Sequence, residues 1–194
     1  MGAKGSKEGA GLTDEERRRD MLACFEKFAR AGGFREKVKH LTTQEIASLD
    51  PKTYVLVDVR PDELRKVSHI PGSITQAEFE QERDGNAGAY SGKTVITSCT
   101  IGYKSGLFAK ELAAKCPSLE VRNHVGSIMD WCHEGKDLVD EEGKKTKKVH
   151  GFGKDFVRYF PHNKGLEFVL DCPTWPTWPD SFDSKSSRSF ESND

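Results

Sequence analysis

The stretch TVITSCTIGYKSGLFAKEL, residues 94–112, changes character at a single cysteine. Its first half carries β-branched residues typical of a buried strand, because such side chains fit a pleated surface. From Ser105 onward, apolar residues recur at helical spacing, so we expect a helix with Ser105 as its N-cap. Cys99 is therefore predicted to lie where a strand ends and a helix begins. At such positions α/β sheets bind ligands, and outward-facing N–H groups favour anions.

The composition indicates a soluble protein with one ordinary domain plus extensions. The chain has 194 residues, 35% of them hydrophobic and 31% charged, and its formal net charge of −1 argues against a nucleic-acid partner. No apolar run approaches the roughly 20 residues that span a bilayer, and no secretory segment is visible. Its five cysteines form no C-x-x-C pair, which indicates free thiols in a reducing compartment, so we expect a cytoplasmic protein.

Residues 1–12 form a tail that we expect to be flexible. Its start, MGAKGSKEG, fits the N-myristoylation pattern, with Gly2 as the acceptor and Ser6 at the hydroxyl position. An accidental match in an unstructured tail is the alternative, and the sequence leaves both open. One acyl chain gives only marginal membrane binding, so acylation of Gly2 would support reversible, peripheral membrane contact.

Residues 13–36 are predicted to form an amphipathic helix. Thr13 and Glu16 make a capping box, and two glycines at 32–33 end the helical pattern. The apolar residues fall on one face of the helix. We expect that face to dock on the following domain, and binding of a partner protein is the alternative.

Residues 37–140 alternate between strand and helix patterns. The strand-like segments are TYVLVDV (53–59), TVITS (94–98) and LEVRN (119–123). MDWCHEG (129–135) favours a short helix, and the glycine-rich RDGNAGAYSG (83–92) is predicted to be a loop. This alternation predicts an α/β domain with a parallel sheet covered on both faces.

Residues 141–180 are predicted to be an extension that packs on the domain. EEGKKTKK (141–148) is a charged, exposed turn, and the aromatic segment after it favours a hairpin or strap, with a turn at 163–165. In CPTWPTWPD (172–180) the prolines recur every three residues, and so do the two tryptophans. A polyproline II helix has three residues per turn, so the prolines would lie along one edge and the tryptophans along another. This Trp-Pro strap either packs on the domain or binds a partner module. Residues 181–194 are Ser-rich and predicted to be disordered.

Cys99 is the candidate nucleophile. The thiolate is the reactive form of cysteine, and a helix N-terminus or a nearby cation stabilises that anion. Lys104 supplies the cation, and Gly102 lets the loop curl so that its N–H groups face inward. A buried structural cysteine at a strand end is the alternative.

Three stretches, in the correct order, resemble the rhodanese-homology family. VLVDVRPDELRKVSHIPGSI (55–74) resembles its Asp-Val-Arg…His-Ile-Pro-Gly signature, and CTIGYKS (99–105) resembles its Cys-x-x-Gly-x-(Arg/Lys)-Ser active-site loop. VGSIMDWCHEG (125–135) is similar to the later Gly-Gly…Trp…Gly segment. The resemblance covers about residues 37–139. It implies a rhodanese-like three-layer α/β sandwich with a central parallel sheet, to which the N-terminal helix and the C-terminal aromatic extension are added.

The resemblance implies one catalytic residue, Cys99, and two sets of accompanying residues. The loop residues expected to bind substrate are Thr100, Ile101, Gly102, Tyr103, Lys104 and Ser105. The residues expected to support the loop are Asp58, Arg60, Glu63 and His69. For Asp58 and Arg60, we expect hydrogen bonds that support the loop rather than a direct part in catalysis. Glu63 either pairs with the loop or begins a helix, and His69 is expected to be a turn residue rather than a base.

Rhodanese-type chemistry implies a two-step sulfur transfer. Cys99 would take the outer sulfur of a small anionic donor such as thiosulfate, hold it as a persulfide, and pass it to a thiol or to cyanide. No cofactor is required. Cys132 and His133 lack a second pair at ligand spacing, so no metal site is expected.

Two other functions stay open. The first is an interaction or scaffold module with little turnover, tethered to a membrane if its N-terminus is acylated. The second, weaker alternative is a phosphatase or arsenate reductase, whose relatives use Cys-x5-Arg, whereas the residue six after Cys99 is Ser105. Lys104 also stands where the rhodanese loop often has arginine, and Ser68 and Ser127 stand where the family usually has glycine.

Overall fold

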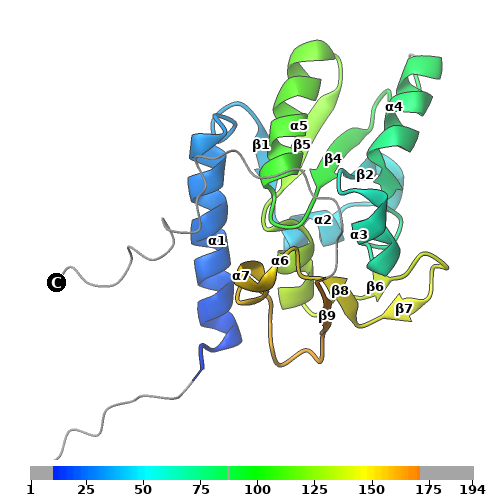
Figure 1. Cartoon of the computed structure of the whole chain (residues 1–194). Coiled ribbons are helices and arrows are strands. Elements are labelled where there is room, and N and C mark those ends of the chain that lie inside the picture. The colour runs from blue at the N-terminus through cyan, green and yellow to red at the C-terminus, as the bar shows by residue number, and fades with distance from the viewer. Residues whose placement is uncertain (1–10, 87, 171–194) are drawn as a thin grey trace, which may run out of the picture.

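The computed structural model describes residues 11–86 and 88–170. The predictions for Gly2, for the Trp-Pro strap and for the Ser-rich tail concern residues outside these ranges. Figure 1 shows a central sheet with helices packed around it. Among the helices of the described ranges, none is long and apolar enough to span a membrane.

The centre of the domain is a five-stranded sheet whose neighbouring strands all run parallel. In sheet order the strands are β1 (Lys39–Leu41), β5 (Glu120–His124), β4 (Thr94–Ser98), β2 (Tyr54–Asp58) and β3 (Ile74–Thr75). Consecutive residues of the two inner strands, such as Leu56 with Val57 and Val95 with Ile96, are buried, as in a sheet covered on both faces. The predicted α/β fold with a central parallel sheet is confirmed.

Strands β2 and β4 end at the same edge of the sheet. Their register pairs Tyr54 with Thr94 and Asp58 with Ser98, so Cys99 follows β4 at the level where β2 ends. In a parallel sheet this carboxyl edge is where ligands bind. The fold therefore brings the ends of two predicted motifs, at Asp58 and at Cys99, to one place.

Six helices surround the sheet. They are α1 (Asp14–Ala31), α2 (Thr43–Ser48), α3 (Asp62–Val67), α4 (Gln76–Gly85), α5 (Tyr103–Lys115) and α6 (Ser127–His133), and a 3-10 turn, η1 (Pro51–Thr53), precedes β2. α5 packs on β4 and β5, and α4 packs on β2 and β3. Figure 1 shows α1 running along the outside of the domain beside α5.

Helix α1 is the predicted N-terminal helix, and it has the predicted cap. The side chains of Thr13 and Glu16 each accept a hydrogen bond from the other's main-chain N–H, at 3.2 and 2.8 Å. Met21, Phe25 and Phe28 are buried where α1 meets α5 and α6. The expectation that the apolar face docks on the domain is confirmed.

Several helix boundaries differ from the prediction. The helix expected over residues 13–36 ends at Ala31, because Gly32 caps it. Helix α5 starts at Tyr103 with Gly102 as its N-cap, so the assignment of Ser105 as the N-cap is wrong. Gly102 has a φ of +102°, which glycine adopts readily, and the turn it makes starts the helix before the serine is reached. The loop predicted at 83–92 is wrong in its first part, because α4, begun by its own capping box, continues to Gly85.

The C-terminal extension adds short elements to the domain. They are β6 (Leu138–Val139), β7 (Lys145–Thr146), β8 (Lys148–His150), α7 (Lys154–Val157) and β9 (Glu167–Val169). β6 and β7 form an antiparallel pair around the predicted exposed turn. The hairpin expected in the aromatic segment is wrong, because β8 and β9 pair in parallel and the connection through α7 turns the chain back to its first direction. Val149 and Phe160 are fully buried, so the extension packs on the domain, with β8 against α3 (Figure 1).

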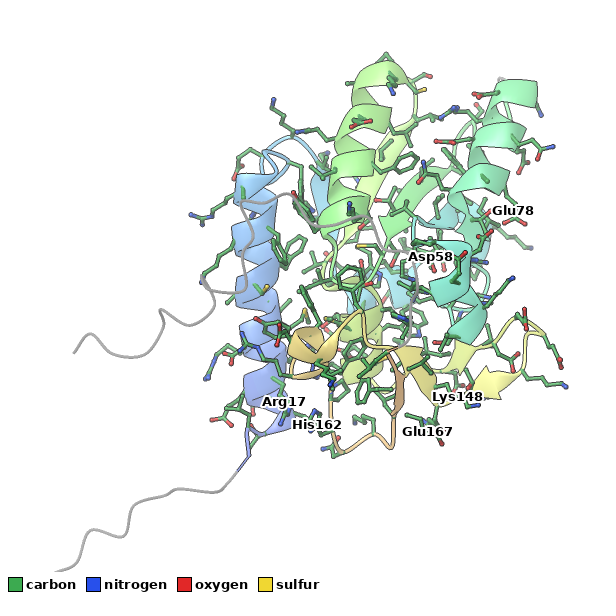
Figure 2. The ribbon with its side chains drawn as sticks, in the orientation of Figure 1. Arg17, Asp58, Glu78, Lys148, His162 and Glu167 are labelled. Carbon is green, nitrogen blue, oxygen red and sulfur yellow. The ribbon has the colours of Figure 1, made fainter. Side chains whose placement is uncertain are left out.

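The extension also contacts the N-terminal end of α1. The Asp14 carboxylate accepts a hydrogen bond from the main-chain N–H of His162 at 2.7 Å, and Arg17 donates to the carbonyl of Arg158 at 2.8 Å. Figure 2 shows Arg17 and His162 close together at this end of the helix. The turn predicted at 163–165 is present, and these bonds attach its start to α1.

Candidate active site

Cys99 lies on the loop between β4 and α5, with 5% of the residue exposed. Two donors reach its sulfur, the Gly102 N–H at 3.2 Å and the Ser105 hydroxyl at 3.4 Å. A thiol sulfur is a weak acceptor, whereas bonds to an ionised acceptor are about twice as strong. The N-terminus of α5 adds the positive end of a helix dipole at the same place. The structure thus puts Cys99 where the sequence predicts it.

Glycine is required at position 102. Besides the positive φ, a Cβ atom there would lie 2.8 Å from the ring of Phe25 and 3.0 Å from the carbonyl oxygen of His124. Phe25 belongs to α1, so the N-terminal helix packs directly behind the loop. The close approach of α1 therefore fixes the conformation that turns the Gly102 N–H toward the sulfur.

Asn123 of β5 holds the loop from the neighbouring strand. Its side-chain NH2 group donates to the Gly102 carbonyl at 2.9 Å, and its side-chain oxygen accepts from the Ser105 hydroxyl at 2.7 Å. Asn123 is fully buried, and the two bonds fix the orientation of its amide. This residue was not predicted. The sequence feature that could have indicated it is an amide side chain within LEVRN, the strand that pairs with β4.

Helix α6 supports the other side of Cys99. The Cys99 N–H donates to the Ser127 hydroxyl at 3.0 Å, and the Ile128 N–H donates to the Cys99 carbonyl at 3.3 Å. Ser127 has a φ of +47°, a conformation that favours glycine, which agrees with its position at a usual glycine of the family pattern. Here the serine hydroxyl is used to bind the backbone of the nucleophile.

A pocket opens beside Cys99. Its lining residues are Val59, Arg60, Cys99, Thr100, Ile101, Tyr103, Lys104, Phe152 and Phe156. Four of the predicted substrate-binding loop residues are in this set. The other two, Gly102 and Ser105, instead contact the sulfur itself. The predicted loop residues therefore come together at one site.

Asp58 and Arg60 form a buried ion pair at the end of β2. The Arg60 side chain is 2% exposed, its Nη2 lies 2.7 Å from the Asp58 carboxylate, and it also donates to the Ser68 carbonyl at 2.8 Å. Arg65 Nη1 lies 3.6 Å from the same carboxylate, and Figure 2 labels Asp58 at this end of the sheet. The predicted support role fits Asp58. Arg60 binds Asp58 and also lines the pocket beside Cys99, which a purely supporting role does not require.

The remaining two predicted residues lie away from the pocket. Glu63 is exposed in the first turn of α3, so of its two alternatives it begins a helix and does not pair with the loop. His69 pairs through its backbone with Val139, and its Nδ1 lies 3.2 Å from the Arg65 carbonyl. Burial, followed by the charge of Arg65, lowers the pKa of His69. It is a hydrogen-bonded turn residue, as the sequence predicts.

Phe152 and Phe156 form an aromatic wall of the pocket that the sequence did not reveal. Their ring centroids are 5.3 Å apart in an edge-to-face arrangement. Phe152 has a φ of +63°, unusual for a bulky residue, and its N–H donates to Nδ1 of His150 at 3.0 Å. The aromatic character of this segment was visible in the sequence. Its position against Cys99 depends on the parallel pairing of β8 with β9, which the pattern did not predict.

Cys24 and Cys132 lie in a different environment from Cys99. Burial raises the pKa of Cys132 to about 12 and also raises the pKa of Cys24, so both remain thiols at neutral pH. Over residues 11–86 and 88–170, no group of three or more His, Cys, Asp or Glu side chains could hold a metal ion. The chemistry of the described site therefore centres on Cys99.

Comparison with known proteins identifies a family over more than half of the chain. A family model described as the rhodanese-like domain matches residues 23–134. The matched region begins within α1 and ends before β6, so it includes the Cys99 loop but neither phenylalanine of the aromatic wall. A search of curated proteins found no match.

The search of solved structures found matches at low sequence identity. Thiosulfate sulfurtransferase from Pseudomonas aeruginosa is 20% identical over 72% of this chain and 26% of its own, with a TM-score of 0.50. A rhodanese-like domain protein from Staphylococcus aureus is 24% identical over 54% of this chain and 99% of its own, with a TM-score of 0.43. A Rhodopseudomonas palustris protein of unknown function, titled a possible tyrosine phosphatase, is 19% identical over 69% and 99%, also with a TM-score of 0.43.

Proposed function

Because the chain belongs to the rhodanese-like domain family, we propose that it is a single-domain sulfurtransferase that carries sulfur on Cys99. The observation that carries this proposal is the pair of donors on the Cys99 sulfur, from Gly102 and Ser105, beside a pocket with two cationic side chains. Such a site stabilises a sulfur anion and attracts an anionic donor.

The first step loads sulfur onto the enzyme. The Cys99 thiolate attacks the outer sulfur of thiosulfate, a new S–S bond forms, and the original S–S bond breaks. Sulfite leaves with the electron pair of the broken bond, and Cys99 is left as a persulfide anion. The Gly102 N–H and the Ser105 hydroxyl, already within reach of the sulfur, help to stabilise the anion.

The second step transfers the outer sulfur from Cys99 to an acceptor. A thiolate acceptor attacks the outer sulfur of the persulfide, and the product persulfide leaves while the Cys99 thiolate is regenerated. Cyanide serves as an acceptor in the same way and leaves as thiocyanate. Charge and electrons balance in both steps, so neither a cofactor nor an external oxidant is needed.

The geometry gives less support to phosphoryl chemistry. Helix α5 begins only a few residues after Cys99, and Ser105 inside that helix occupies the place where the phosphatase pattern has its arginine. A serine hydroxyl lacks the planar two-bond fork with which arginine holds phosphate. Sulfur transfer is therefore the function that the site supports best.

Mass spectrometry of the protein before and after thiosulfate tests the proposal. We expect an added mass of about 32 Da, one sulfur atom, on the peptide that contains Cys99, and its loss on addition of cyanide. Cys99→Ser should fold normally and carry no adduct, whereas Cys132→Ser should behave as wild type. Absence of the adduct with both thiosulfate and a persulfide donor would refute the proposal and support an interaction module.

A further inference from the structure

We propose that Arg60 binds the oxygen atoms of the sulfur donor and so makes the pocket selective for donors whose leaving group is an oxyanion. This inference rests on the proposed sulfur transfer at Cys99. It assigns Arg60 a substrate contact in place of the purely supporting role suggested by the sequence.

Most of the Arg60 guanidinium is already occupied. Nε lies 3.0 Å from one Asp58 carboxylate oxygen, and Nη2 lies 2.7 Å from the other. Nη2 also donates to the Ser68 carbonyl at 2.8 Å. These bonds fix the plane and the position of the group, so little freedom is left to lose when a ligand binds.

The third nitrogen, Nη1, has no hydrogen-bond partner among the described residues. It is buried, and Arg60 as a whole is 5% exposed. Folded proteins rarely leave a buried donor of a charged group unsatisfied, because its lost hydration is not replaced. Arg60 lines the same pocket as Cys99, so an occupant of that pocket can supply the missing acceptor.

The charge around Arg60 also favours an anion. One carboxylate, Asp58, faces two guanidiniums, since Arg65 lies 3.6 Å from it in addition to Arg60. Asp62 and Glu78 also interact with Arg65, so the second guanidinium is balanced by these carboxylates, and the additional positive charge at the pocket lining comes from Lys104. The aromatic wall of Phe152 and Phe156 lowers the local dielectric, which strengthens the attraction of these cations for an anion.

A donor such as thiosulfate has two chemically different ends that match the two sides of this pocket. Its outer sulfur reacts at Cys99, and its sulfonate oxygens are acceptors for Nη1. When the S–S bond breaks, the departing sulfite keeps the electron pair and negative charge grows on those oxygens, so Arg60 stabilises the transition state. A persulfide donor releases a thiolate without oxygen atoms, and Arg60 has nothing comparable to bind.

Arg60→Lys tests the inference through the choice of donor. The lysine keeps a positive charge beside Asp58 but lacks the planar group that binds the carboxylate through Nε and Nη2 and leaves Nη1 for a ligand. We expect kcat/KM with thiosulfate to fall about tenfold or more, and kcat/KM with cysteamine persulfide, whose leaving thiolate carries no oxygen atom, to change less than about threefold. Arg65→Lys is the matched control, since Arg65 also faces Asp58 but does not line the pocket, and it should affect both donors alike.

A binding measurement separates this inference from the proposed function. Cys99→Ser should bind thiosulfate without turnover, and adding Arg60→Lys should weaken that binding about tenfold by calorimetry. Equal losses with both donors, or unchanged thiosulfate binding, would overturn the role of Arg60. If wild type transfers no sulfur from any donor, the proposed function fails, while the binding result still decides the Arg60 contact. If Arg60→Lys does not fold, the double variant Asp58→Asn/Arg60→Gln replaces it in both experiments, because this variant removes the two buried charges together.

Discussion

Replacing Ser105 by alanine removes one hydroxyl that serves two neighbours. Its oxygen lies 2.7 Å from the side-chain oxygen of Asn123 and 3.4 Å from the sulfur of Cys99. A hydroxyl has a single proton, so it donates to one of them at a time. With Cys99 as a thiol the proton serves Asn123, and with Cys99 as a thiolate or persulfide it can rotate to the sulfur.

The effect of Ser105→Ala on the free energy of unfolding follows from the hydrogen bond that the Asn123 side-chain oxygen loses. Its oxygen would keep only the Thr97 hydroxyl, 3.4 Å away, and that hydroxyl lies nearer to the carbonyls of Ser105 and Arg122. A buried acceptor left almost unsatisfied costs about 1–3 kcal/mol, and alanine returns about 0.5 kcal/mol through its helix propensity. We expect the free energy of unfolding to fall by about 0.5–2.5 kcal/mol and Tm by roughly 1–10 °C.

The effect on activity is a separate quantity. The lost bond to the sulfur is long, so we take the lower end of the range for bonds to charged groups, about 1.4 kcal/mol, which is about tenfold in rate. We expect kcat/KM with thiosulfate and the alkylation rate of Cys99 by iodoacetamide at pH 7 both to fall by about this factor. Alkylation reports on the nucleophile alone, without donor binding.

Ser48→Ala is the matched control. Ser48 is exposed in α2, and its hydroxyl donates to the Gln44 carbonyl at 2.8 Å, so the same atoms are removed far from Cys99. Its activity and Tm should stay close to those of wild type. A Ser105→Ala protein with a lowered Tm but wild-type alkylation and transfer rates would show that the hydroxyl supports Asn123 only.

Three further predictions follow from the site. Gly102→Ala should lower Tm and abolish transfer, because its Cβ would meet Phe25 and His124 at a φ of +102°; a near-normal Tm would contradict this. Burial lowers the pKa of His124 to about 4, against about 6.5 unfolded, so the unfolded chain binds the extra proton and stability should fall by up to about 3 kcal/mol from pH 6.5 toward pH 4. Denaturant titrations at pH 7.5 and 5 check the sign. Lys104→Ala should weaken thiosulfate use while Lys104→Arg keeps it, and Cys99-dependent aryl phosphate hydrolysis by either the Arg variant or wild type would refute the sulfur-transfer assignment.

The sequence was sufficient for the central part of the fold and for the position of Cys99 at the end of a strand. Buried parallel strands are continuous apolar runs, and the cysteine followed by a glycine and a cation marks the end of one of them. The helix after it starts at Tyr103 and not at Ser105, because the positive φ of Gly102 makes the turn, which the cap preference of serine does not indicate. A preference of about 1 kcal/mol is easily overridden by a glycine turn and by tertiary contacts.

The parts of the site that the sequence did not reveal all depend on long-range packing. Asn123 acts through a bond to a loop on the neighbouring strand, and nothing in its local pattern distinguishes it from an ordinary polar residue. Phe152 and Phe156 reach the pocket only because β8 and β9 pair in parallel, and strand direction is decided by contacts between distant segments. Arg60 was identified, but the free Nη1 could only be seen once its other bonds were known.

The family match stops at residue 134, and one side of the pocket is built from residues 152 and 156. A chain shortened to the matched segment would keep the nucleophile, the loop and both cations, yet water would enter from the side that the two rings now close. Rates measured on such a fragment would describe a different chemical environment from that of the whole protein. Under the proposed sulfur transfer, substitutions at Phe152 or Phe156 change which donors enter the pocket, while the sequence of the Cys99 loop stays the same.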